Sequence, residues 1–155
     1  MTRSDAGSRL AARLRIALVV SRFNEPVTRP MEEAARRVLI EAGVAEASIS
    51  THHVPGAWEL PLCVSWLLRR GEVDGVVALG CVIRGETPHF EYVSLGATTG
   101  LESLAREHGI PVGFGLLTTD TAAQARARSG GAKGNKGEEA AIAVLQMCEI
   151  AADLG

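Results

Sequence analysis

The hydrophobic residues of the chain gather into four short runs that are rich in β-branched side chains and apolar at successive positions. Runs of this kind are typical of strands inside a parallel sheet, because helices cover both faces of such a sheet. The pattern predicts buried strands at residues 16–21, 49–54, 75–82 and 112–117.

Longer segments with helical start and stop signals separate these runs. Thr28 is expected to cap the first helix, which Gly43 ends, and Gly71 and Gly109 are expected to end the next two. The remaining segments predict helices at 59–70 and 90–108, a short helix to about residue 128, a glycine-rich loop at 129–137 and a last helix at 138–154. This alternation predicts a three-layer αβα sandwich around a four-stranded parallel sheet.

Most unusual residues fall in the connections that lead from a strand into the following helix. The reverse connections, around the three glycine stops, carry plain helix ends. In open parallel sheets, ligands bind beyond the carboxyl ends of the strands. We therefore expect one functional site at that edge, built from segments 22–25, 55–59, 83–89 and 118–120.

Composition and charge narrow the classes of function. The chain has 155 residues, of which 46% are hydrophobic and 22% are charged, and this composition indicates one globular domain. We assign residues 1–14 to an N-terminal arm and residues 15–155 to that domain. Sixteen basic and eighteen acidic residues give a formal net charge of −2, which leaves no broad basic field for nucleic acid or an anionic membrane. The longest apolar run, 76–83, is too short to span a bilayer.

Several common catalytic motifs are absent from the sequence. No glycine-rich turn follows the first strand, and the segment 130–137 lacks the Gly-Lys-Ser/Thr of a nucleotide-binding loop. No Ser or Cys lies in a nucleophile elbow. The three cysteines, Cys63, Cys81 and Cys148, are far apart and lack metal-ligand spacing, which favours buried thiols in a reducing compartment over a disulfide or a zinc site.

A phosphate site is compatible with the loop before the third helix. Gly85, Glu86 and Thr87 precede that helix, where free backbone N–H groups attract anions, and Arg128 could add a guanidinium. The alternative is that Gly85 only permits a tight turn and Thr87 only caps the helix. The residues of this segment alone leave both interpretations open.

Other side chains near the same edge suggest proton transfer and stacking. His89 lies in a predicted strand-end loop, and an imidazole exchanges protons near neutral pH. Phe23, Trp58 and Phe114 lie close to the edge and would suit a flat heterocycle, whereas Phe90 and Tyr92 are expected to fill the core. Glu59, at a helix start, would either bind hydroxyl groups or satisfy the local dipole.

These loops closely resemble those of the lumazine synthase family over about residues 15–150. The resemblance is carried by Arg22-Phe-Asn, Val54-Pro-Gly-Ala-Trp-Glu-Leu-Pro61, Leu79-Gly-Cys-Val-Ile-Arg-Gly-Glu-Thr-Pro-His-Phe-Glu-Tyr92, Gly115-Leu-Leu-Thr-Thr119 and Gly134-Asn-Lys-Gly137. It implies a flavodoxin-like fold. It also implies condensation of 5-amino-6-(D-ribitylamino)uracil with 3,4-dihydroxy-2-butanone 4-phosphate, the penultimate step of riboflavin synthesis, without a metal or organic cofactor.

The resemblance also implies a role for each candidate residue. Phe23 would stack on the pyrimidine, the backbone of Val82 and Ile83 would bind its edge, and His89 would shuttle the proton. The remaining residues would complete three subsites: Ala57, Trp58 and Glu59 hold the ribityl chain, Gly85, Glu86, Thr87 and Arg128 cradle the phosphate, and Phe114 and Lys136 complete the pocket. In the family, the segment that carries the last of these residues comes from a neighbouring subunit.

The same resemblance implies an assembly of copies of the chain. We expect a cytoplasmic homopentamer whose N-terminal arm adds to a neighbour's sheet, closing into an icosahedral shell, with riboflavin synthase as a partner. Lys133 and Ala132 stand in exchanged order relative to the commonest family pattern, in the hinge that correlates with shell closure. The alternatives are a non-catalytic flavin or lumazine binder, or a shell protein, on the same fold.

Overall fold

A four-stranded parallel sheet lies between two layers of helices in the computed structural model, which describes residues 3–155. The strand order is β2-β1-β3-β4, from β1 (Ile16–Ser21), β2 (Ile49–Val54), β3 (Gly75–Ile83) and β4 (Val112–Thr119). The helices are α1 (Arg3–Ala11), α2 (Glu25–Ala42), α3 (Leu60–Arg70), α4 (His89–His108), α5 (Ala122–Ala127) and α6 (Lys136–Leu154), with 3₁₀ turns at Glu46–Ser48 and Ala57–Glu59. The predicted three-layer α/β fold and its four strands are confirmed.

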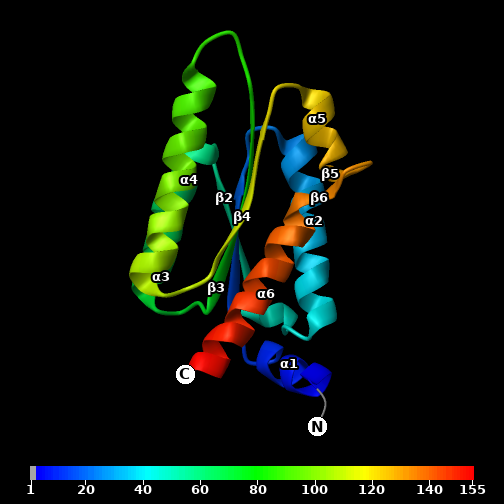
Figure 1. Ribbon diagram of the computed structural model, residues 1–155, viewed down its shortest axis with the longest axis vertical. Coiled ribbons are helices and arrows are strands. Elements are labelled where there is room, and N and C mark those ends of the chain that lie inside the picture. Colours follow the sequence, from blue (N-terminus) through cyan, green and yellow to red (C-terminus); the bar gives the residue numbers. More distant parts are fainter. Residues whose placement is uncertain (1–2) are drawn as a thin grey trace.

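Each face of the sheet has its own hydrophobic core, because successive side chains of a strand point to opposite faces. Leu18 and Val20 of β1 belong to the core that includes Met31 of α2 and Val144 of α6. The second core lies under α3 and α4 and includes Val19. Figure 1 shows α3 and α4 on one side of the sheet and α2 and α6 on the other.

Helix α2 begins earlier than the sequence suggested. Its N-cap is Asn24, which has a left-handed backbone with φ of 63°, and Pro26 stands in the first turn. Thr28 lies inside the helix, and its hydroxyl donates a 2.9 Å hydrogen bond to the carbonyl oxygen of Ser21. The expectation that Thr28 caps the helix is therefore wrong, because its hydroxyl bonds to the end of β1 instead.

The predicted helix stops are confirmed. Gly43, Gly71 and Gly109 have φ of 110°, 67° and 64°, the left-handed conformation that ends helices at little steric cost. The segment expected as a glycine-rich loop is instead a short antiparallel hairpin of β5 (Ser129–Gly131) and β6 (Gly134–Asn135), after which α6 begins.

The N-terminal segment differs from the extended arm expected on a neighbour's sheet. Residues 3–11 form α1, which packs against α2 and α6 of the same chain, while residues 1–2 lie outside the described part. Leu10 packs against the core, and Ala11 and Leu14 are buried in it. These apolar side chains therefore favour packing of the segment on its own chain. The division into 1–14 and 15–155 stays a prediction. Among the described residues, no helix is long and apolar enough to cross a membrane.

The starts of β1 and β3 are joined by a pair of charged side chains. The backbone N–H and Nε of Arg15 donate to Oδ2 of Asp74 at 2.8 and 3.2 Å, and Nη2 lies 3.2 Å from Oδ1. Partial burial of Asp74 opposes its ionisation, but the hydrogen bonds and charge of Arg15 outweigh this and hold the pKa of Asp74 below its ordinary value.

Asp74→Asn is expected to lower the free energy of unfolding by about 0.5–1.5 kcal/mol at pH 7, a modest value because the pair is partly exposed. The contribution is present above the ordinary carboxyl pKa and is lost as the pH falls through the lowered value in the folded state. Urea unfolding of both proteins from pH 7 to pH 3 measures this. A difference that stayed constant over this range would contradict the assignment.

Candidate functional site

The carboxyl ends of all four strands meet at one edge of the sheet, as predicted, at the top of Figure 1. Hydrogen bonds between the loops fix their relative positions. They run from the N–H of Arg22 to the carbonyl oxygen of Val54 (2.8 Å), from the N–H of Phe23 to Pro55 (3.1 Å), from Nδ2 of Asn24 to Cys81 (2.9 Å) and from the N–H of Arg84 to Thr119 (2.8 Å). Each loop is therefore tied to a neighbouring loop or strand.

Ten predicted site residues lie at the carboxyl ends of β1, β2 and β3 or in the segments that follow them, and we call them the loop cluster. They are Phe23, Ala57, Trp58, Glu59, Val82, Ile83, Gly85, Glu86, Thr87 and His89. Phe23 is 71% exposed and Trp58 is 61% exposed, so these two aromatic side chains are available to a ligand. Exposed large aromatic side chains beside a polar loop are typical of sites that bind flat organic molecules.

The turn after β2 is held by Glu59. Its Oε2 accepts a 3.0 Å hydrogen bond from the N–H of Gly56, which closes the turn around Ala57 and Trp58. The interpretation that Glu59 satisfies the local backbone is therefore correct at least for this oxygen. The indole of Trp58 lies against α4 where Gly96 leaves room, because a Cβ there would be 2.4 Å from Cζ3 of the indole.

The loop between β3 and α4 is open to solvent. Gly85, Glu86 and Thr87 are all exposed, and a Cβ at Gly85 would meet no heavy atom within 4 Å. Helix α4 begins at His89, its N-cap is Pro88, and no side chain caps it, so Thr87 is not a helix cap. The N–H of Glu91 donates to the carbonyl oxygen of Pro88 at 3.0 Å, so the N–H groups of His89 and Phe90 are the ones at this helix start that precede the helical hydrogen bonds, and together with the loop they favour an anion.

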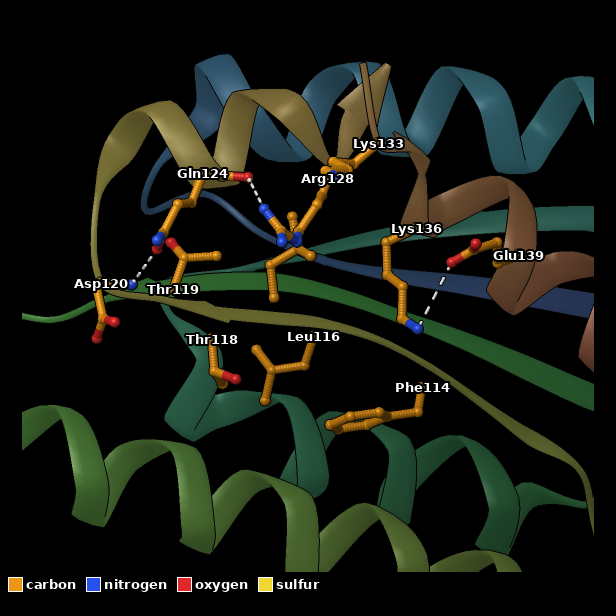
Figure 2. A pocket seen from close by; sticks show the side chains of 11 residues that line it. Phe114, Leu116, Thr118, Thr119, Asp120, Gln124, Arg128, Lys133, Lys136 and Glu139 are labelled. Atoms are coloured by element: carbon orange, nitrogen blue, oxygen red, sulfur yellow. Dashed lines mark hydrogen bonds and ion pairs between the residues drawn. The ribbon is translucent and has the colours of Figure 1, made fainter. Parts of the chain in front are cut away.

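A second group of predicted residues lies along β4, the strand at the edge of the sheet. Phe114, Arg128 and Lys136 line a pocket of about 590 Å³ that we call the β4–α6 pocket (Figure 2). Its other lining residues are Leu116, Leu117, Thr118, Thr119, Asp120, Gln124, Lys133 and Glu139. None of the loop-cluster residues of the same chain lines this pocket.

Local structure holds the cations of the pocket in place. Nη1 of Arg128 donates to the carbonyl oxygen of Gln124 at 3.1 Å, and the carbonyl oxygen of Arg128 accepts from the N–H of Lys136 at 2.8 Å. Nζ of Lys136 lies 3.5 Å from Oε2 of Glu139. Figure 2 shows the side chain of Lys136 on the side of the pocket that holds Phe114 and that of Arg128 near Gln124, so the pocket combines an aromatic face with positive charge.

The start of α6 is fixed by its packing on α2. Oδ1 of Asn135 accepts from the N–H groups of Gly137 and Glu138 at 2.9 and 3.2 Å, while Nδ2 donates to Pro30 at 3.2 Å. Gly137 permits this close approach, since a Cβ there would lie 2.2 Å from the carbonyl oxygen of Met31. The contacts of Asn135 and Gly137 thus fix the backbone on both sides of Lys136, which lines the pocket.

Three polar residues of this pocket were missed by sequence reasoning. Gln124, Lys133 and Glu139 come together with Asp120, which belongs to the expected segment 118–120, only through the hairpin and the short helix α5. A partial signal existed in the sequence, because Lys133 and Lys136 are the only two lysines and occupy one short segment.

The cysteines take no part in either group. All three are free, and burial raises the pKa of the Cys81 and Cys148 thiols to about 11, which keeps them neutral. Within the described part of the chain, no three metal-ligating side chains gather into a possible metal site.

Comparison with known proteins agrees with the motifs in these loops. The chain matches a family model described as 6,7-dimethyl-8-ribityllumazine synthase over residues 13–152. A relative with that name from Porphyromonas gingivalis is 46% identical over 137 residues, which are 88% of this chain and 85% of the relative. One from Gemmatimonas aurantiaca is 49% identical over 136 residues, 88% of this chain and 83% of the relative.

Proposed function

The chain belongs to the 6,7-dimethyl-8-ribityllumazine synthase family, and on this premise we propose how its residues carry out the family's reaction. It is a transferase that condenses 5-amino-6-(D-ribitylamino)uracil with 3,4-dihydroxy-2-butanone 4-phosphate in riboflavin biosynthesis, releasing phosphate and water. The observation that carries this assignment is the family match, which spans every candidate site residue.

The loop cluster binds the pyrimidine substrate in this proposal. Phe23, exposed at the end of β1, stacks on the pyrimidine ring, and the main chain of Val82 and Ile83 binds the edge of that ring. The turn of Ala57, Trp58 and Glu59 binds the ribityl hydroxyl groups. The hydrogen bond of Glu59 to Gly56 supports this role, because it gives the turn one defined shape before substrate arrives.

The phosphate of the second substrate lies against the loop between β3 and α4. Gly85, Glu86 and Thr87 present backbone and side-chain groups there, next to the first turn of α4. Arg128 adds a guanidinium, whose planar geometry matches phosphate oxygens. The openness of this loop supports the role, since its polar groups remain available to a ligand.

The chemistry asks for orientation and proton transfer rather than for a reactive protein group. The amine of the pyrimidine substrate attacks the butanone carbonyl and forms an imine with loss of water, after which phosphate is eliminated, the product enolises and tautomerises to a carbonyl, and the second amine closes the ring with loss of a second water. Holding two substrates in a reactive geometry supplies much of the rate of such a reaction. His89, exposed at the start of α4, moves the proton.

Two subunits form each complete site in this proposal. Phe114, Arg128 and Lys136 line a pocket that no loop-cluster residue of the same chain enters, so they are placed to serve the loop cluster of a neighbour. Exposed apolar side chains on α3 and α4 support contact between copies, because burying them is favourable; they are Leu62, Trp66, Tyr92 and Leu95. The expectation that Tyr92 fills the core of its own chain is wrong, since its side chain is 72% exposed. We assign the assembly as a homopentamer that closes into an icosahedral shell.

The cell context of the enzyme is part of the same proposal. Three free cysteines suit the reducing cytoplasm, where we place the protein. Riboflavin synthase, which uses the lumazine product, is the proposed protein partner.

His89→Ala is expected to slow turnover without abolishing it, because orientation of the substrates survives the loss of one proton-transfer group. The expected decrease in kcat is about ten- to a thousandfold. Fluorescence of the lumazine and release of phosphate, followed together in wild type and variant, measure it. Complete loss of activity in a correctly assembled variant would contradict this role.

Arg128→Ala is expected to weaken binding of 3,4-dihydroxy-2-butanone 4-phosphate by about 2–5 kcal/mol, the usual scale for leaving a buried charge unpaired. Arg126→Ala is the matched control, because Arg126 is exposed on α5 and does not line the pocket. Titration calorimetry with that substrate measures both variants. Unchanged affinity in Arg128→Ala would remove Arg128 from the site.

Sedimentation velocity tests the assembly. A closed shell is expected to sediment as one species far larger than a pentamer. Its size is defined because a closed assembly has no free interface to which further copies could add. Lys133 and Ala132 lie in the hairpin next to α6, so exchanging them (Ala132→Lys with Lys133→Ala) tests whether this hinge affects closure. A sample that contains only free pentamers would contradict the shell, and one that contains only monomers would contradict the shared site.

A further inference from the structure

One arginine of segment 83–89 that has no assigned role stands at the start of the loop proposed to bind phosphate and contacts residues at its far end. Arg84 is the first residue after β3, and its guanidinium carbon lies 4.6 Å from the centre of the Phe90 ring. Its Nη1 lies 3.4 Å from Oε1 of Glu91. Phe90 and Glu91 belong to the first turn of α4, so the side chain of Arg84 spans the four residues, 85–88, that separate Arg84 from that helix.

The same guanidinium also reaches the next loop. Its Nε donates to Oδ1 of Asp120 at 2.8 Å, and the backbone N–H of Arg84 donates to the carbonyl oxygen of Thr119 at 2.8 Å. Asp120 follows β4 directly, so Arg84 ties the loop to the neighbouring strand end as well as to α4.

Asp120 continues this connection toward the β4–α6 pocket. Its N–H donates to Oε1 of Gln124 at 2.8 Å, and the carbonyl oxygen of Gln124 accepts from Nη1 of Arg128 at 3.1 Å. A continuous set of contacts therefore runs from Arg84 to Arg128, and it links the loop cluster of a chain to that chain's own pocket.

The loop itself has little other support. Residues 85–88 are all exposed, and the space around Gly85 is empty of protein atoms. A loop with so few packed neighbours moves readily unless its ends are held. Ordering it only when ligand arrives would reduce affinity, because the loop would then lose its conformational freedom on binding.

From these contacts we infer that Arg84 is a positioning residue, which holds both ends of the loop 85–88 so that its N–H groups and His89 meet the phosphate-bearing substrate in one arrangement. This inference rests on the proposed phosphate site. Both members of the Arg84–Asp120 pair are exposed, and exposed ion pairs contribute little to overall stability. The effect of Arg84 therefore falls on substrate binding rather than on folding.

The test compares Arg84→Ala, Arg84→Lys, Asp120→Asn and the double variant Arg84→Ala with Asp120→Asn. The readouts are KM for each substrate, kcat, Tm and the Kd of inorganic phosphate. Arg106→Ala is the matched control, since Arg106 makes an exposed two-bond pair with Glu102 on the same helix, at 2.5 and 3.0 Å. It is expected to leave all kinetic constants unchanged.

Arg84→Ala is expected to raise KM for the butanone phosphate and the Kd of phosphate about tenfold, the lower range of effects carried through a contact network. KM for the pyrimidine is expected to change less than twofold and Tm by less than about 2 °C. Asp120→Asn is expected to act in the same direction, the double variant to be no worse than Arg84→Ala, and Arg84→Lys to recover part of the loss.

Three results would overturn the inference. Unchanged phosphate affinity in Arg84→Ala would show that the loop does not depend on this side chain. A loss in Arg84→Ala with none in Asp120→Asn would mean that Arg84 binds phosphate directly. Equal losses for both substrates with a lower Tm would indicate a structural role. If the wild-type protein formed no lumazine but bound phosphate with these dependences, the proposed function would fail while the inference held.

Discussion

The main-chain hydrogen bonds of the parallel sheet are the constraint on which the rest of the structure depends. They pair β1 with β2 and β3, and β3 with β4, with all four strands in the same direction. Parallel pairing brings the carboxyl ends of the strands to one edge, so four loops far apart in the sequence become neighbours. The candidate site side chains are then positioned by a buried sheet, while the loops themselves stay open to solvent.

The position of β4 at the edge of the sheet decides how the candidate site is divided. Its inner side pairs with β3, next to the loop cluster, and its outer side has no strand partner among the described residues. The hairpin, α5 and the start of α6 gather around that free edge and carry Arg128 and Lys136. One chain therefore presents two separate binding surfaces, one of aromatic and backbone groups and one of positive charges beside Phe114.

Much of the fold could be predicted because its signals are local. Continuous apolar runs indicated the strands, and a glycine after each helical segment indicated the helix ends at Gly43, Gly71 and Gly109. All three glycines have positive φ in the structure. The predictions that were wrong depended on distant partners. Thr28 was predicted to cap the helix, but its hydroxyl donates to the carbonyl oxygen of Ser21 instead. The sequence of the first fourteen residues did not indicate that Ala11 and Leu14 would be buried in the core of their own chain.

The same distinction applies to the site. Loop motifs pointed to the candidate residues, but the contacts of Arg84 and the grouping of Asp120, Gln124 and Lys133 follow from how β3, β4 and α5 lie in space. A pattern read along the chain contains no information about the Arg84–Asp120 pair, because its members are 36 positions apart. Only the folded chain brings them together.

The central claim, that each site joins the loop cluster of one chain to the β4–α6 pocket of another, is tested most directly by subunit complementation. One chain carries Phe23→Ala with His89→Ala, the other carries Phe114→Ala with Arg128→Ala, and the two are produced together in equal amounts. With random assembly in a ring, half the loop clusters and half the pockets are intact, so about a quarter of the sites are fully wild type. The account predicts lumazine synthesis at about a quarter of the wild-type rate, well above either variant alone. Activity no higher than the average of the two separate variants would place the whole site within one chain and contradict the account.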